Sequence, residues 1–160
     1  MASTKSRLIR TLSGTRTVTG GIPAYAVATD MLVRDLTVRR LEGDYEAQNF
    51  VTGFEGAQGD RLYNVSAGLD FMVDGSLPDA GDAPLYGPLL TACGLTETLT
   101  ASTSATYSLT PEGTPKGELA FQYVDALTSQ VSEKARGALS FTAETKKPPM
   151  FGFKFMGEHF

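Results

Sequence analysis

Few side chains of this sequence have the chemistry that catalysis requires. The single histidine, His159, is next to last in the sequence, whereas a catalytic triad or a histidine metal site needs an imidazole held inside a cleft. The single cysteine, Cys93, falls on the apolar stripe of an expected helix, where a thiolate is disfavoured and the residue packs as a small hydrophobe. We therefore predict that the protein has no catalytic residues and is not an enzyme.

Carboxylates are the other candidates for chemistry, and three of them, Asp74, Asp79 and Asp82, lie close together in the sequence. Their spacing does not match a calcium-binding loop, and Pro78 and Ala83 interrupt the run, so turn formation and helix capping are the expected roles. Neither of the two common glycine-rich phosphate loops occurs. The sequence therefore predicts no metal site and no cofactor.

The charge of the chain limits its partners. The net charge of -4 over 160 residues argues against a conventional nucleic-acid-binding protein. The charge is unevenly distributed, because residues 1–16 contain four basic residues and no acid, whereas residues 42–82 contain nine acids. This asymmetry could steer copies of the chain together, or it could only keep the surface soluble.

The sequence shows no targeting or membrane segment. No stretch approaches the roughly 18 to 20 apolar residues that span a bilayer, and the basic first residues lack the apolar core of a secretory signal. We expect synthesis in a cytoplasm, no membrane insertion and, with one cysteine, no intramolecular disulfide.

The elements that must position any functional residue are mostly strands. Residues 61–73 give the clearest signal, because apolar residues from Tyr63 to Val73 alternate with small or polar ones. One short helix is expected at about 84–93, with Asp82 as its cap and Gly94 at its end. Further strands are expected at 31–41, 104–110, 118–125, 136–145 and 149–157.

These elements predict a mainly β fold. We expect two packed antiparallel β-sheets, sandwich-like or barrel-like, with one short flanking α-helix. Residues 1–27 lack periodicity and are expected to form an N-terminal arm, and residues 28–160 a single domain. A long glycine-rich loop is expected at 43–60, and its aromatic residues either dock onto a partner or fold back onto the core. The aromatic residues in question are Tyr45, Phe50 and Phe54.

Four sequence blocks resemble a known family. APLYGPLLTACGL (83–95) resembles the helix of the tail tube proteins of long-tailed phages. Three further blocks are similar, in order, to the family's strand before the long loop, its central strand and its closing hairpin. They are LTVRRLEGDYEAQNF (36–50), GDRLYNVSAGLDFMVDG (59–75) and ARGALSFTAETKKPPMFGFKFMG (135–157). The resemblance covers roughly residues 31–157.

The resemblance implies a structural virion protein. Six subunits would form a ring in which the inner sheets join into one continuous β-barrel, and rings would stack into the tail tube through the N-terminal arm, the long loop and the C-terminus. Its partners would be copies of itself, the tape-measure protein, the tail terminator and the tail-tip proteins, and phage DNA would pass through during genome ejection without specific binding. The inter-subunit candidates are Lys5, Arg7, Arg10, Tyr45, Phe50 and Phe54.

The alternation in 61–73 suggests which residues would line such a channel. A DNA conduit is expected to present polar and acidic residues, and Asn64, Ser66 and Asp70 are the candidates. Tyr63, Val65, Leu69 and Phe71 would then turn to the core. Three alternatives remain: a tube-like ring of a tail tip or related injection apparatus, a monomeric β-barrel that binds a small apolar ligand in a pocket lined by phenylalanines, and a carboxylate-based hydrolase.

Overall fold

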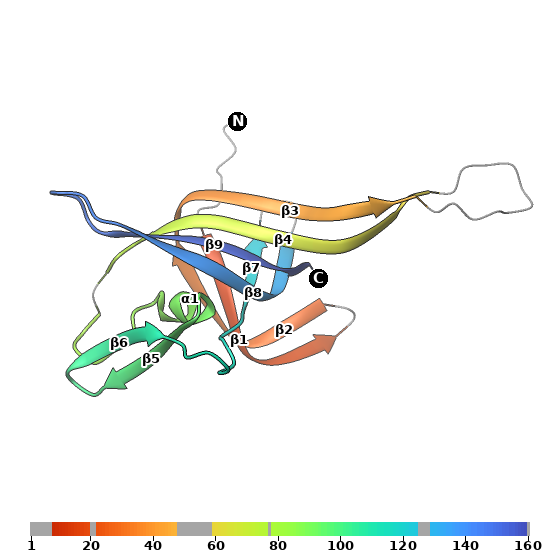
Figure 1. Ribbon diagram of the computed structural model, residues 1–160. Helices are drawn as coiled ribbons and strands as arrows, with labels where there is room; N and C mark the ends of the chain where they lie inside the picture. Colours follow the sequence, from red (N-terminus) through yellow and green to blue (C-terminus); the bar gives the residue numbers. More distant parts are fainter. Residues whose placement is uncertain (1–7, 20–21, 48–58, 77, 125–128, 160) are drawn as a thin grey trace, which may run out of the picture.

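The computed structural model describes residues 8–19, 22–47, 59–76, 78–124 and 129–159 (Figure 1). Strands dominate these ranges, and the only helix in them is six residues long, which confirms the mainly β prediction. No helix in the described ranges is long and apolar enough to cross a membrane. The elements in chain order are β1 (Leu8–Thr19), β2 (Ile22–Leu32), β3 (Arg34–Glu46), β4 (Arg61–Asp74), α1 (Gly87–Ala92), β5 (Leu95–Thr100), β6 (Ser104–Leu109), β7 (Leu119–Val124), β8 (Ser129–Thr142) and β9 (Met150–His159).

Seven of the strands form one antiparallel sheet in the order β2-β1-β7-β8-β9-β4-β3, and β5 and β6 form a separate hairpin. The large sheet curls, because its two edge strands, β2 and β3, are joined by Val33 alone and so meet at one corner. A bulge in β8 at Lys134, whose φ is +49°, divides the sheet into two layers. Strand β8 pairs with β7 before and just after this bulge, through residues up to Ala135, and continues to Thr142 paired with β9 alone.

The two layers enclose the core. The back layer consists of β2, β1 and β7, and the front layer consists of β3, β4, β9 and residues 136–142 of β8. Phe121 of the back layer packs against Phe155 of the front layer, with ring centroids 4.7 Å apart, and against Phe71 at 6.3 Å. Helix α1 adds Leu89 and Leu90 to the same cluster, so it closes one side of the folded sheet (Figure 1).

The helix is shorter than predicted. It spans Gly87–Ala92 rather than about 84–93, because Pro88 occupies its first turn and delays regular hydrogen bonding. Asp82 does not cap it; Tyr86 is at the N-cap position and makes no side-chain cap hydrogen bond. Gly94 ends the helix as expected, with a φ of +89° that strongly favours glycine.

The predicted N-terminal arm is wrong for most of its length. Strands β1 and β2 occupy residues 8–19 and 22–32, and β1 also pairs with β7 in the middle of the sheet. These strands could not be recognised from the local sequence, because a bulge between Ser13 and Arg16 breaks the alternation of side chains. The predicted loop at 43–60 also begins too early, since β3 continues to Glu46; residues 1–7 and 48–58 lie outside the described ranges.

Candidate assembly surface

The front layer has one face against the core and one face that points away from it, which we call the outer face. Along β4, the inward residues from Ala67 to Val73 are each at most 6% exposed, which confirms the predicted alternation over this half of the strand. Ser66 and Asp70 alternate with them and therefore lie on the outer face, as predicted.

The register extends this face across all four strands of the front layer. Asp70 is opposite Thr37 of β3 and Lys154 of β9, and Lys154 is opposite Ala138 of β8. The next row joins Arg39, Gly68, Met156 and Arg136. Because opposite residues in antiparallel strands lie on the same face, these rows form one continuous surface.

Ion pairs balance the charge of this surface. The Arg39 Nη2 atom lies 2.8 Å from the Asp70 Oδ1 atom, and its guanidinium lies over Gly68, where a Cβ atom would come within 2.9 Å of it. Three more pairs have N–O distances of 2.6 to 2.8 Å: Arg34–Asp74, Lys134–Glu158 and Arg136–Glu118. The outer face is therefore polar, and three of its acids, Asp70, Asp74 and Glu158, are each paired with a cation.

The front layer has two free edges among the described residues. Strand β3 pairs with β4 on one side and is the last strand of the sheet. Residues 136–142 of β8 pair with β9 on one side, because the β7–β8 pairing ends at Ala135. Leu139 and Phe141 in this second edge are 37% and 59% exposed. Both edges present backbone groups that another strand can pair with.

Beyond Ser66 the β3–β4 pair leaves the sheet, because β9 pairs with β4 only from that residue onward. We call residues 42–46 and 61–65 the projecting ribbon. Within it Asn64 has a φ of +53° and donates a side-chain hydrogen bond to Asp44, at 3.2 Å. Asn64 is an extra residue relative to β3, so it shifts the alternation by one position.

This bulge corrects one prediction. Tyr63 was expected in the core, but it is 47% exposed and opposite Asp44, on the side of the outer face. Tyr45, an inter-subunit candidate, is 71% exposed in the same ribbon. Of the other candidates, Arg10 lies in β1 rather than in a free arm, and Lys5, Arg7, Phe50 and Phe54 lie outside the described residues.

Cys93 and Tyr107, which lie outside this surface, have pKa values raised by their surroundings. Burial raises the pKa of the Cys93 thiol to about 11, so the thiolate is disfavoured at neutral pH, as the sequence predicts. Burial, and then a hydrogen bond donated to Glu97, raises the pKa of Tyr107. Within the described ranges, no group of three or more His, Cys, Asp or Glu side chains is arranged to hold a metal ion.

Comparisons with protein-family models, with characterised proteins and with solved structures each found no match. The function of the chain is therefore inferred from its own surfaces. These are the outer face, the two free edges of the front layer and the projecting ribbon.

Proposed function

We propose that the chain is a structural subunit that assembles with copies of itself, edge to edge, into rings that stack as the tail tube of a long-tailed phage. The observation that supports this most is the pair of free edges on the front layer, at β3 and at residues 136–142 of β8. The free edges indicate assembly in general, and the resemblance of four sequence blocks to tail tube proteins is the reason for proposing stacked rings.

Strand direction makes the two edges compatible. Neighbours in the order β3-β4-β9-β8 are all antiparallel, so β3 and β8 run in opposite directions across the front layer. If β3 of one copy lies beside residues 136–142 of the next, the new pair is antiparallel as well. Each added copy then continues the same pattern, and a closed ring leaves no edge of this layer unpaired.

The β8 edge also has the composition of a buried contact. Residues 136–142 contain no proline, and the only charged residue among them is Arg136, which is paired with Glu118. Natural edge strands that stay monomeric are commonly protected by charges, proline or a covering element. The exposed Leu139 and Phe141 instead favour association.

In such a ring the outer face would line the channel. Arg39, Lys134 and Arg136 are each paired with an acid, and Lys154 lies directly opposite Asp70, so this face offers phosphate groups no cluster of unbalanced positive charge of the kind that binds DNA. DNA and a tape-measure protein would therefore pass along this wall without a specific site. Ser66 and Asp70 are the candidate lining residues that lie on it, and Asn64 lies at its end in the projecting ribbon.

Purified protein tests the proposal directly. Sedimentation and negative-stain electron microscopy should show rings or tubes at high concentration, and the double variant A138K/S140K should remain a folded monomer because two lysines block the β8 edge. Thr98→Lys, at an exposed position on β5 away from both edges, is the matched control and should assemble normally. A wild-type chain that remains a well-folded monomer at every concentration would refute the proposal.

The same microscopy separates the alternatives. A tail-tip ring would share the edge contact but would give single rings instead of long tubes. A monomeric ligand-binding barrel would need an interior pocket lined by phenylalanines, whereas Phe71, Phe121 and Phe155 fill the space between the layers by packing on one another.

A further inference from the structure

We infer that a cleft beside the β5–β6 hairpin binds a small organic cation, a ligand with an apolar body and a positively charged end. This binding site is additional to the proposed self-assembly and does not depend on it. Three observations support it: the aromatic lining of the cleft, the sign of the charges around it, and the contacts that hold its walls in place.

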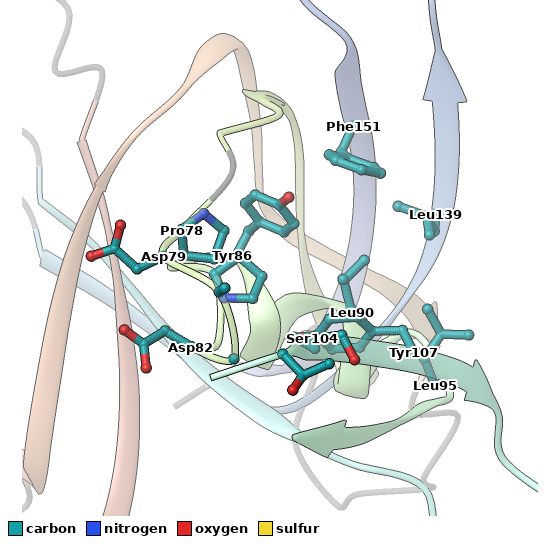
Figure 2. A pocket seen from close by; sticks show the side chains of 15 residues that line it. Pro78, Asp79, Asp82, Tyr86, Leu90, Leu95, Ser104, Tyr107, Leu139 and Phe151 are labelled. Atoms are coloured by element: carbon teal, nitrogen blue, oxygen red, sulfur yellow. The ribbon is translucent and has the colours of Figure 1, made fainter. Parts of the chain in front are cut away.

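The cleft has a volume of about 420 Å³ and lies between the loop before α1, the β5–β6 hairpin and the β8–β9 pair (Figure 2). We call it the hairpin cleft. Its lining includes the rings of Tyr86, Tyr107 and Phe151 and the side chains of Leu90 and Leu95. A largely apolar cavity of this size is suited to a compact apolar group.

Acids supply the charge of the lining. Asp79 and Asp82 line the cleft, and no lysine or arginine is among its described lining residues. Neither acid is in an ion pair within the part of the chain that the structure describes. Their carboxylates lie at the rim, on the side away from Phe151 and Leu139 (Figure 2). The hairpin cleft therefore has an apolar end and a negative end, which suits a ligand with the complementary pair of ends.

A third carboxylate lies behind the Tyr107 wall. The Tyr107 hydroxyl donates a hydrogen bond to the Glu97 carboxylate. Gly87 of α1 leaves room for this pair, because a Cβ atom there would come within 2.7 Å of the Tyr107 hydroxyl and 2.9 Å of the Glu97 Oε2 atom. The faces of aromatic rings are negative, and a phenol hydrogen-bonded to a carboxylate is polarised further. The Tyr107 wall should therefore attract cations.

The other aromatic walls are held in place by contacts within the chain. The Tyr86 hydroxyl donates a hydrogen bond to the backbone carbonyl of Ser76, at 3.2 Å. The Tyr86 ring packs against Phe151, with ring centroids 5.0 Å apart. Binding therefore costs little ordering of these side chains. Aromatic walls near carboxylates are the surroundings in which proteins recognise quaternary ammonium groups.

Basic residues on neighbouring elements do not neutralise the cleft. Arg34 and Lys147 are each in an ion pair with an acid, and Lys154 lies on the outer face, opposite Asp70. Lys116 and Lys146 do not line the cleft either. An anionic ligand would therefore meet carboxylates at the rim and no cation in the lining.

Titration of the whole chain with three ligands of similar size, followed by the NMR signals of the ligand, tests the site. Phenyltrimethylammonium is the cation, tert-butylbenzene is its neutral carbon isostere, and benzenesulfonate is the anion. The cation should bind about tenfold more tightly than the neutral isostere, because it gains the attraction of the rings and the carboxylates. The anion should not bind.

Two variants separate the contributions of charge and rings. D79N/D82N should weaken binding of the cation about threefold to fivefold and leave binding of the isostere unchanged. The matched control D60N/E112Q removes the same net charge at exposed positions outside the cleft and should leave both affinities unchanged. F151L removes one aromatic wall but keeps an apolar side chain, and should weaken binding of the cation more than that of the isostere.

Each opposite result overturns the inference. Equal affinity for the cation and its isostere would show that the cleft does not select charge. Equal losses in D79N/D82N and D60N/E112Q would assign the effect to the net charge of the chain and not to this site. Absence of binding by all three ligands would show that the cleft is not a ligand site. None of these results bears on self-assembly, which sedimentation measures separately.

Discussion

The two halves of β4 differ although they belong to one strand with one alternating pattern. Residues 66–74 have a neighbouring strand on each side and a core beneath, whereas residues 61–63 pair with β3 alone. Phe71 in the first half is 3% exposed and Tyr63 in the second is 47% exposed. The alternation of apolar residues therefore indicates burial only where the tertiary structure supplies a partner on both sides.

The two halves of β4 also differ in what they contribute, one to the stability of the subunit and the other to its assembly. In the packed half, residues 66–74, the Phe71 ring packs against Phe121, Phe153 and Phe155 of the same chain. The projecting ribbon is a two-stranded piece, which is marginal in water without a surface to pack on. We infer that the first half holds the subunit together and that the second serves contacts between copies. Substitutions in the two halves should therefore have different effects.

The largest difference is expected between Phe71→Ala and Tyr63→Ala. Removing the Phe71 ring leaves a cavity among three other phenylalanines and should lower the free energy of unfolding by about 3 to 5 kcal/mol. Tyr63→Ala should lower it by less than about 1 kcal/mol, because the side chain is already half in water. Urea denaturation in the A138K/S140K background measures both without a contribution from assembly. Equal losses would show that the ribbon is part of the folded core.

The sequence alone predicted the packed half and failed on the other. Residues 67–73 alternate regularly, so their core face could be predicted, and Gly94 marked the end of the helix. The bulge at Asn64 could not be predicted, because nothing local distinguishes an extra residue from a continuing strand. Strands β1 and β2 were missed for the same reason, since the bulge between Ser13 and Arg16 breaks the alternation of their hairpin, and the second partner of β1, strand β7, is distant in sequence.

For the candidate surface too, the sequence predicted the face on which residues lie but not the contacts between strands. Ser66 and Asp70 were assigned correctly to the face away from the core, because only the side-chain period was needed. The cations that pair with the acids come from β3 and β8, so they could not be placed without the register. The free edge at 136–142 depends on where β7 stops pairing, which no local pattern marks.

A smaller difference is expected between the polar pairs of the two halves. Asp70→Ala removes the acid that pairs with Arg39, whose Nε atom is already buried without a hydrogen-bond partner among the described residues. It should lower the free energy of unfolding by about 1 to 2 kcal/mol, since a partly buried cation is left unpaired. Asp44→Ala removes only an exposed hydrogen bond to Asn64 and should cost less than about 0.5 kcal/mol. Asp70→Asn tests the role of charge, because it keeps an acceptor for Arg39.

The smallest effect is expected at the bulge that divides the halves. Asn64 adopts a φ of +53°, which a β-branched residue reaches only with strain, so Asn64→Val should lower the free energy of unfolding by about 1 kcal/mol. Asn64→Gly accepts the same backbone conformation and should change it by less than about 0.5 kcal/mol, although it also loses the hydrogen bond to Asp44. The two variants thus separate backbone strain from the side-chain contact.

Equal losses of unfolding free energy in the two variants would assign the effect to the contact with Asp44. A loss for Asn64→Gly alone would mean that the positive φ does not constrain the ribbon. If Asn64→Val also weakens assembly beyond its effect on stability, the bulge is what aims the ribbon at the neighbouring copy.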